Sequence, residues 1–482
     1  MTASLAGVRF LGVSTVALLA AGCAAAGSST RAQAAAEPAL PSAPLDAQLG
    51  AVPGARAFWM PDAEFGGSIY VVVVDPPGGA IAVPLVLVHG LGAAAGRDFD
   101  AVVPALARGR RVVVLDLPGF GRSSRANELY TPERYAAVVA RVIDRFCGGR
   151  ADVLGHSMGG AVALMHAATH ARQVRRLVLV DVAGVLHREA WFAHHLRRVT
   201  DPAAPLFPAA VDELNQLVAT VFSSTRVLDP VPAVVLLTPM LREKILDGDP
   251  GRIAALSLIL TDFSDAIPTV VAPTLLIWGG GDQVAPLRTG QLLADRLPRA
   301  TLTVLDGVGH NVMAEAPARL LGAVAPFLDA ATDGPPAPAV LAEPSRGDVT
   351  CSKRDDLRLA GTYDDVVLDG CQGVLLEGVS MRHLVMRDSS ARAVHARVAA
   401  GIVLSRSHLL VTGGSVAGEI ALALTDSDAD VAGVTFAARR SVYRLDGTSR
   451  AIFSVCAVSG SGASRALHAV VESRGDVVEG GR

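Results

Sequence analysis

The sequence predicts an α/β fold, with a mostly parallel sheet covered by helices on both faces, followed by a separate all-β domain. From residue 68 to about residue 330, short runs of Val, Leu and Ile alternate with helix-like stretches, a pattern typical of a doubly covered parallel sheet. After residue 349 the helical spacing disappears, and β-like triplets recur at intervals of eight to eleven residues. The chain of 482 residues is long enough for two such domains.

The composition excludes some classes of function. The formal net charge is −3 and charged residues make up 18% of the chain. A nucleic-acid-binding protein needs a basic surface to neutralise phosphates, so we expect no nucleic-acid partner. The mean hydropathy of +0.40 is high, but the apolar residues are mostly Ala and Val with polar interruptions, and no segment after the amino terminus reaches the length of a membrane-spanning helix.

The amino terminus predicts export. Arg9 precedes an apolar run at residues 10–26, which is rich in small residues and fits a secretory signal. The segment Leu18–Cys23 resembles a bacterial lipoprotein box, with residues 1–22 as the signal peptide and Cys23 as the lipid-bearing residue. That resemblance implies an exported protein of the cell envelope, anchored to a membrane by the lipid at Cys23. A plain signal peptide is the alternative.

The remaining boundaries follow from composition. Residues 23–55 are rich in Ala, Ser and Pro without an apolar period, which predicts a flexible tether. The α/β domain is expected over residues 56–330. A Pro-rich linker at 331–346 separates it from the all-β domain at 347–482.

The strands of the α/β domain are expected in the following order. The runs are residues 69–74, 85–88, 111–115, 152–154, 177–180, 274–277 and 301–305. Helix-like stretches, such as 132–146 and 160–170, lie between most of them.

A G-x-S-x-G motif at residues 155–159 carries the chemistry. It follows the strand 152–154 and opens the next helix, which is the context that this motif requires. The turn puts Ser157 at a strained backbone position at the amino end of a helix, where negative charge is favoured. Side chains at positions 155 and 159 would collide with the neighbouring helix and strand, so glycine is expected at both.

A serine hydroxyl needs a base and an orienting acid to act as a nucleophile. His310, in a Gly-rich loop after the last strand, is the predicted base. Asp282, after the strand 274–277, is the predicted acid, and the order Ser, Asp, His along the chain agrees with the motif. Asp181 also ends a strand and is the competing acid; positioning of the neighbouring loop is its other role.

An oxyanion hole needs two backbone donors. We expect one from Met158, directly after the nucleophile, and the other from Leu91, in the turn after the strand 85–88. His89 and His156 are interpreted as structural residues.

Together these motifs resemble the α/β-hydrolase superfamily over residues 56–330. The matching segments are His89–Gly92, Asp116–Ser124, the serine motif, Asp282 and His310. Since the nucleophile position holds Ser157, the resemblance implies the serine branch, in which an esterase- or lipase-like enzyme cleaves a small-molecule or lipid carboxylic ester through an acyl-enzyme, with no metal and no organic cofactor. Hydrolysis of a C–C bond by the same triad, and a non-catalytic envelope binding or scaffold protein, are the alternatives.

The resemblance also implies that residues 185–268 form a helical cap over the site. Helix-like stretches are expected at residues 188–199, 211–222, 231–246 and 251–260. Its large apolar residues suit an apolar acyl or aromatic group, or pack the cap on the body: Trp191, Phe192, Phe207, Phe222 and Met240. The pair His194 and His195 is interpreted as cap surface.

The last domain is expected to be a short right-handed parallel β-helix, because short strands with turns at quasi-regular intervals are typical of solenoids. An antiparallel β-sandwich is the alternative. Cys351 and Cys371 are the best candidates for a disulfide. A glycan or protein partner of this domain is expected only by analogy of shape.

Overall fold

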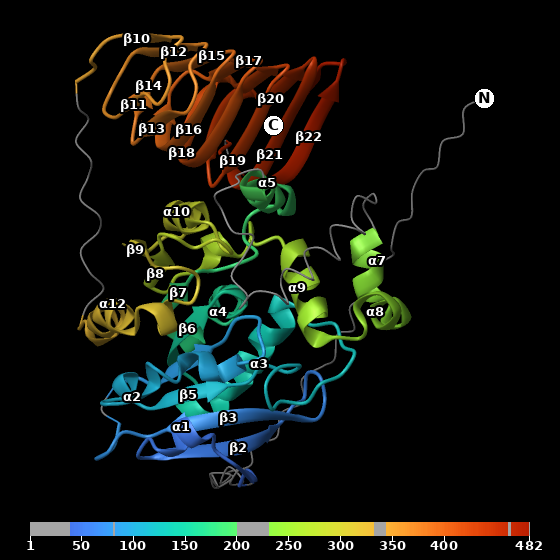
Figure 1. The fold of residues 1–482 in the computed structure, drawn as a ribbon, viewed down its shortest axis with the longest axis vertical. Coiled ribbons are helices and arrows are strands. Elements are labelled where there is room, and N and C mark those ends of the chain that lie inside the picture. Colours follow the sequence, from blue (N-terminus) through green and yellow to red (C-terminus); the bar gives the residue numbers. More distant parts are fainter. Residues whose placement is uncertain (1–38, 81, 200–230, 332–343, 461–463, 482) are drawn as a thin grey trace, which may run out of the picture. The chain divides into compact units, whose positions relative to one another are not determined.

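The computed structural model describes residues 39–80, 82–199, 231–331, 344–460 and 464–481. Residues 40–482 form one compact unit. These residues build two sheets, one of nine strands in an α/β part and one of fourteen strands in the C-terminal part (Figure 1). The lipidation candidate Cys23 lies outside the described residues. None of the described helices has the length and apolar character needed to cross a bilayer.

The nine-stranded sheet has the order β1-β2-β3-β5-β4-β6-β7-β8-β9. Its strands are β1 (Ser42–Ala43), β2 (Ala55–Pro61), β3 (Ser68–Val74), β4 (Leu85–Val88), β5 (Val112–Leu115), β6 (Ala151–His156), β7 (Val174–Val180), β8 (Thr274–Gly279) and β9 (Ala300–Leu305). Strands β4 to β9 pair in parallel, whereas β1, β2 and β3 add an antiparallel edge. The predicted, mostly parallel sheet is confirmed.

The edge begins earlier than the sequence suggested. Strand β1 and helix α1 (Ala47–Gly50) lie within residues 23–55, where a flexible tether was expected. The side chain of Leu49 is buried, and the Tyr70 hydroxyl donates a hydrogen bond to Pro44 O at 2.8 Å. These contacts with β3 order a segment that has no apolar period of its own.

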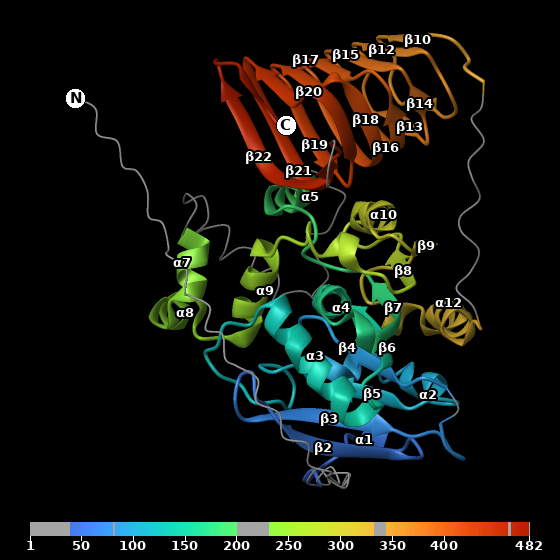
Figure 2. The same cartoon turned by 180° about the vertical axis from the view of Figure 1, so that it is seen from behind.

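Helices lie on both faces of the sheet (Figure 2). They are η1 (Ala95–Phe99), α2 (Val103–Leu106), α3 (Pro132–Cys147), α4 (Met158–Thr169), η2 (Ala171–Gln173), η4 (Ile267–Thr269), α10 (Leu287–Arg296), α11 (Val312–Glu315) and α12 (Pro317–Asp329). Alternate residues of β3 point to opposite faces. Val71 and Val73 pack in the apolar cluster that includes α3 and α4, and Val72 and Val74 pack in the cluster that includes α12. Both faces of the sheet are therefore buried.

Helix α3 shows how the local sequence sets its ends. The Thr131 side chain caps the first turn by accepting a hydrogen bond from Arg134 N at 3.3 Å, and Pro132 is the first helical residue. Gly148 ends the helix in the left-handed region, with φ of 67°.

The region expected to form the cap, residues 185–268, contains four helices among its described residues. They are α5 (Arg188–Val199), α7 (Val231–Leu237), α8 (Pro239–Leu246) and α9 (Pro250–Leu260). The predicted helix 211–222 lies outside the described residues. The single helix expected over 231–246 is wrong, because Pro239 cannot continue an upstream helix and instead begins a new one.

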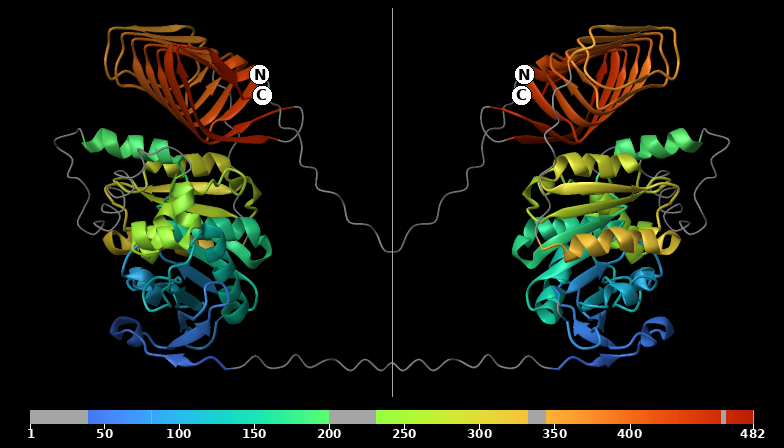
Figure 3. Two further views of the ribbon diagram at one scale, coloured as in Figure 1. Left: turned by 90° about the vertical axis from the view of Figure 1, so that its right-hand side faces the viewer. Right: turned by 90° about the vertical axis from the view of Figure 1, so that its left-hand side faces the viewer.

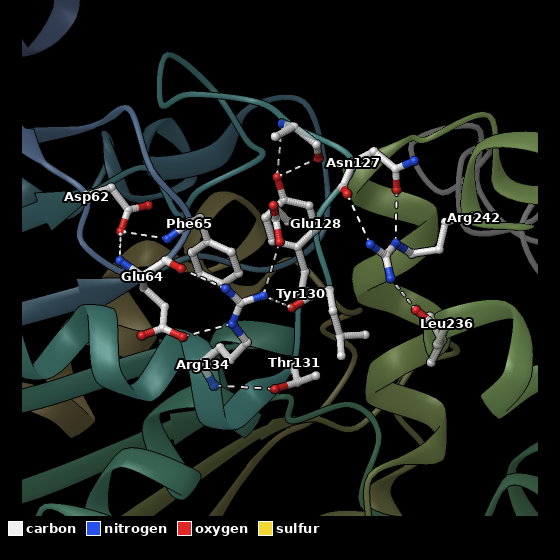
Figure 4. A network of polar contacts seen from close by, with 12 residues as sticks. Asp62, Glu64, Phe65, Asn127, Glu128, Tyr130, Thr131, Arg134, Leu236 and Arg242 are labelled. Atoms are coloured by element: carbon white, nitrogen blue, oxygen red, sulfur yellow. Dashed lines mark hydrogen bonds and ion pairs between the residues drawn. The ribbon is translucent and has the colours of Figure 1, made fainter. Parts of the chain in front are cut away.

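Arg242 connects the expected cap to the body, and Arg134 makes polar contacts nearby within the body (Figure 4). Arg242 of α8 donates to Asn127 Oδ1 at 2.9 Å, to Asn127 O at 3.1 Å and to Leu236 O of α7. Arg134 of α3 donates to Glu64 Oε1 at 2.8 Å. The Arg242 bonds hold α8 to α7 and to the loop that precedes α3, whereas the Arg134 bond joins α3 to the loop between β2 and β3.

The C-terminal part is an all-β domain. Its strands are β10 (Val349–Ser352), β11 (Arg358–Leu359), β12 (Asp365–Asp369), β13 (Val374–Glu377), β14 (Ser380–Met381), β15 (His383–Arg387), β16 (Ser390–Val398), β17 (Ile402–Ser405), β18 (His408–Thr425), β19 (Asp428–Ala432), β20 (Thr435–Asp446), β21 (Thr448–Val458), β22 (Arg465–Arg474) and β23 (Val478–Gly480). Strands β10 to β21 pair in parallel, and the separation of paired residues rises from 17 (Val349 with Val366) to 22 (Asp428 with Arg450). Strand β22 pairs antiparallel with β21, and β23 pairs antiparallel with β20.

A disulfide and a column of buried serines connect successive strands of this domain. Cys351 and Cys371 are bonded, which confirms the predicted pair. Beginning at Cys371, five serine hydroxyl groups each accept a hydrogen bond, at 3.0 to 3.3 Å, from the backbone N–H of a residue about 20 positions earlier. The acceptors are Ser389, Ser407, Ser427, Ser449 and Ser473.

The all-β domain contacts the α/β part through α10 and α5 (Figure 3). Arg288 of α10 forms a buried ion pair with Asp430 of β19, with nitrogen-to-oxygen distances of 2.7 and 3.1 Å. Asp295 of α10 accepts a hydrogen bond from Gly414 N at 2.7 Å. Arg450 of β21 pairs with Glu189 of α5 at 3.1 Å.

Candidate active site

The serine motif forms a tight turn between β6 and α4. Ser157 lies between them with φ of 53° and ψ of −119°, a conformation rarely adopted by a residue with a side chain. A Cβ at position 155 would lie 2.2 Å from Gly159 O, and one at position 159 would lie 2.1 Å from Val88 O. Glycine is therefore required at both positions, for the steric reason that the sequence suggested.

Ser157, His310 and Asp282 form a continuous chain of hydrogen bonds. His310 Nε2 lies 3.0 Å from Ser157 Oγ, and His310 Nδ1 lies 2.8 Å from Asp282 Oδ2. Because a carboxylate only accepts, Nδ1 carries the proton and Nε2 is free to accept the serine proton. The structure thus brings together the three residues that the sequence selected.

The loop after β8 holds the carboxylate of Asp282. Its Oδ1 accepts hydrogen bonds from Val284 N at 2.7 Å and from Ala285 N at 3.0 Å, and its side chain is fully buried. Oδ2 remains directed at His310. The side chain of His310 keeps 19% of its surface exposed, so solvent reaches the base and not the acid.

The two expected oxyanion donors lie on segments that meet at the nucleophile. Met158 is the first residue of α4, so its N–H has no acceptor within its own helix. The turn that contains Leu91 is close, because a Cβ on Gly90 would lie 3.0 Å from the Cβ of Ser157. Both segments therefore lie next to Ser157.

Both ring nitrogens of His89 are hydrogen-bonded, one within its own turn and one to the segment after β5. Nε2 accepts a hydrogen bond from Leu117 N at 2.9 Å, so Nδ1 carries the proton and donates to Gly90 O at 2.7 Å. The ring is fully buried. These contacts agree with the structural role expected from the sequence.

His156 supports the base, a contact that sequence reasoning missed. Its Nε2 donates to His310 O at 2.9 Å, and the two ring centroids are 4.9 Å apart. Burial, and after it the proximity of His310, lowers the pKa of His156 to about 3. The ring is therefore neutral at ordinary pH. A histidine beside the nucleophile in the motif was the available signal.

Asp181, the competing acid, lies directly after β7. Its side chain is buried, and Oδ1 accepts a hydrogen bond from Gly279 N of β8 at 2.8 Å. The carboxylate hydrogen-bonded to His310 Nδ1 is that of Asp282. The position of Asp181 fits the alternative role of fixing the neighbouring strand end.

One group among the described residues has three side chains close enough to share a metal ion. Ligand atoms of His156, Asp181 and His310 lie within 4.8 Å of one another. However, both ring nitrogens of His310 already contact Ser157 and Asp282. The donors therefore fit a hydrogen-bonded cluster behind the nucleophile better than a metal centre.

The large apolar residues expected in the cap differ in their surroundings. Trp191 is buried, and its Nε1 donates to Val284 O at 3.0 Å, so it packs α5 on the loop that holds Asp282. Phe192 packs edge-on against Trp191. Met240 is 60% exposed. Phe207 and Phe222 lie outside the described residues, as does the side chain of His195; His194 is half-buried.

Comparisons with known proteins agree with this architecture. Residues 83–317 match the family model described as the alpha/beta hydrolase fold. The chain is 33% identical over 259 residues to 2-hydroxymuconate semialdehyde hydrolase of Pseudomonas sp. strain CF600, covering 51% of this chain and 86% of that protein. It is 27% identical to Lipase 3 of Moraxella sp. strain TA144, covering 48% and 73%.

A likeness is also found to a solved thermophilic esterase from Thermogutta terrifontis. That structure has 24% sequence identity and a TM-score of 0.40, with 56% of this chain and 97% of that chain covered. The matched residues contain the serine turn, Asp282 and His310. Because the chain covers 86% of a hydrolase to which it is 33% identical, it is an enzyme, a hydrolase that belongs to the α/β-hydrolase fold family.

Proposed function

We propose that the enzyme cleaves a carboxylic ester by nucleophilic catalysis. The hydrogen-bond chain from Ser157 through His310 to Asp282 is the observation that carries the proposal. Ser157 Oγ attacks the ester carbonyl while His310 Nε2 takes its proton, and the N–H groups of Leu91 and Met158 hold the oxyanion. His310 then returns the proton to the leaving alcohol, and water, activated by the same base, releases the acid.

A fluorophosphonate probe tests this assignment. We expect it to label Ser157 in the purified enzyme, and Ser157→Ala to lose both the label and the turnover of p-nitrophenyl esters. Ser124→Ala serves as a control for serine reactivity, because Ser124 Oγ is engaged with Ser68 N at 2.8 Å. Ester turnover that persists in Ser157→Ala would overturn the mechanism.

Hydrolysis of a C–C bond is the second candidate. One relative is named a hydrolase of a semialdehyde and not of an ester, and it is 33% identical to this chain. The same triad would serve both reactions. A panel of esters of increasing acyl length and of activated diketones decides between them by the ratio of kcat/KM values. The hydrogen-bonded triad disfavours the non-catalytic alternative.

A cell-envelope location is part of the proposal. The lipoprotein-like segment ending at Cys23 supports a lipid anchor, with lipid or small-molecule esters as substrates. Radiolabelled palmitate should enter the wild-type chain and not Cys23→Ser. Equal labelling of the two proteins would remove the anchor from the proposal.

We also propose that the all-β domain is a parallel β-helix. Parallel pairing at separations of 17 to 22 residues supports this topology, because a sandwich would place antiparallel strands at its centre. Its partner, a glycan or another protein, remains the expectation made from its shape. Binding of the Ser157→Ala protein to peptidoglycan tests the glycan partner, because this variant is expected to bind without turnover.

A further inference from the structure

Two carboxyl groups lie at neighbouring strand ends behind His310. Asp181 follows β7 directly, and Asp282 follows the adjacent strand β8. Asp181 N donates to Ile277 O of β8 at 3.0 Å, so the two strand ends are held in register. A carboxylate oxygen of Asp181 lies within 4.8 Å of a ring nitrogen of His310, the ring whose Nδ1 is hydrogen-bonded to Asp282.

The site has more buried acceptors than donors. Asp181 Oδ2 and His156 Nδ1 are buried, and neither has a hydrogen-bond partner among the described residues. His156 Nδ1 is an acceptor, since Nε2 already donates to His310 O. Two ionised carboxylates cannot bond to each other, because both are acceptors only. Contact between Asp181 and Asp282 therefore requires a proton on one of them.

The surroundings decide which carboxyl holds that proton. Asp282 accepts two backbone N–H groups through Oδ1 and the His310 Nδ1–H through Oδ2, so all three of these contacts are with donors. Asp181 accepts one backbone N–H, from Gly279. Burial, and after it the negative charge of Asp282, raises the pKa of the Asp181 carboxyl well above its usual value.

We propose that Asp181 is a neutral carboxylic acid that donates its Oδ2 proton to the Asp282 carboxylate, and so acts as the positioning residue of the catalytic acid. This inference deepens the proposed function and rests on it. The pair carries a single negative charge. The donated bond holds Asp282 Oδ2 toward His310, while the bond from Gly279 N fixes the other oxygen of Asp181.

Asp181→Asn separates this role from that of an ionised acid. Asparagine keeps one oxygen for Gly279 N and offers an N–H to Asp282, and it tolerates the φ of 46° at this position. We expect kcat of Asp181→Asn to stay within about three-fold of wild type with KM unchanged. Asp282→Asn should lose about 10³–10⁴-fold in kcat. A loss in Asp181→Asn equal to that of Asp282→Asn would overturn the proposal.

Infrared spectroscopy provides a readout that does not depend on turnover. At pH 8 the Ser157→Ala enzyme should show the carbonyl stretch of a protonated carboxyl group, and Ser157→Ala/Asp181→Asn should lose it. Asp181→Gly, which also accepts the positive φ, must lose the same band and covers the case in which the asparagine variant does not fold. A band unchanged by both substitutions would refute a proton on Asp181.

Asp100→Asn is the matched control. Asp100 is also buried, and burial raises its pKa to about 6, so it is ionised at pH 8. Its replacement should leave both the band and the activity unchanged. If no ester is turned over by the wild type while the band follows Asp181 as expected, the protonation stands and the proposed reaction fails.

Discussion

The ion pair between Arg288 and Asp430 connects the two parts of the molecule, and removal of one partner alone should destabilise both parts. The side chains are 7% and 5% exposed, and the pair is bidentate. At 2.7 Å the attraction is about 6 kcal/mol for an effective dielectric constant of about 20. Desolvation offsets most of this, so the net value of the intact pair is small.

The loss of one partner is a different case, because the other charge stays buried. We expect Asp430→Leu to lower the free energy of unfolding by about 3–5 kcal/mol, and Arg288→Leu/Asp430→Leu to recover most of that loss. Urea denaturation of the full chain measures both. All three tryptophans lie in the α/β part, so their fluorescence reports unfolding of that part, and far-UV circular dichroism reports both parts.

The exposed pair of Arg382 with Asp365 is the control, and Arg382→Leu should leave the urea midpoint unchanged. If Asp430→Leu changes the fluorescence midpoint no more than Arg382→Leu does, the pair is not a buried contact between the two parts. If the double variant Arg288→Leu/Asp430→Leu is no more stable than Asp430→Leu, the argument from an unpaired buried charge is refuted.

Three further outcomes are expected. Gly159→Ala should abolish folding or activity, because the added Cβ meets a strand carbonyl oxygen at 2.1 Å; soluble, fully active protein would contradict this. Cys351→Ser/Cys371→Ser should lower stability by about 2–4 kcal/mol in urea, since the closed loop of 20 residues regains entropy on unfolding, and an unchanged midpoint would argue against the disulfide. The raised pKa of Asp100, caused first by burial, means that the folded state binds the proton more tightly, so stability falls as pH rises from about 4 to about 6. Asp100→Asn should reduce that fall, and an identical pH profile of stability would contradict the shift.

The sequence was most informative where a single local pattern decides the structure. Runs of Val and Leu predict the central strands because both faces of a parallel sheet are buried. The serine turn is readable because only glycine fits at positions 155 and 159. Asp282 follows β8, and its place between Ser157 and His310 agrees with the chain order Ser, Asp, His.

Features that depend on contacts between distant segments were not predicted. Strand β1 has two residues and is ordered by its pairing with β2, so its own sequence carries no signal. The hydrogen bond from His156 to His310 O joins residues 154 positions apart. The pairing of Arg288 with Asp430 likewise requires the surfaces of two separately folded segments, and neither residue is unusual in its local sequence.

The antiparallel strands at the carboxyl end of the all-β domain make its two ends different. Strand β10 pairs on one side only, with β12, so among the described residues the first strand of the domain presents an open edge. At the other end, β22 reverses against β21 and β23 reverses against β20. A strand from a second molecule cannot continue the parallel ladder across this reversal. The two ends of the domain therefore offer different free edges: β10 can be extended in the parallel sense, whereas β22 lies antiparallel to the ladder and, in the described part of the chain, is itself paired on one side only.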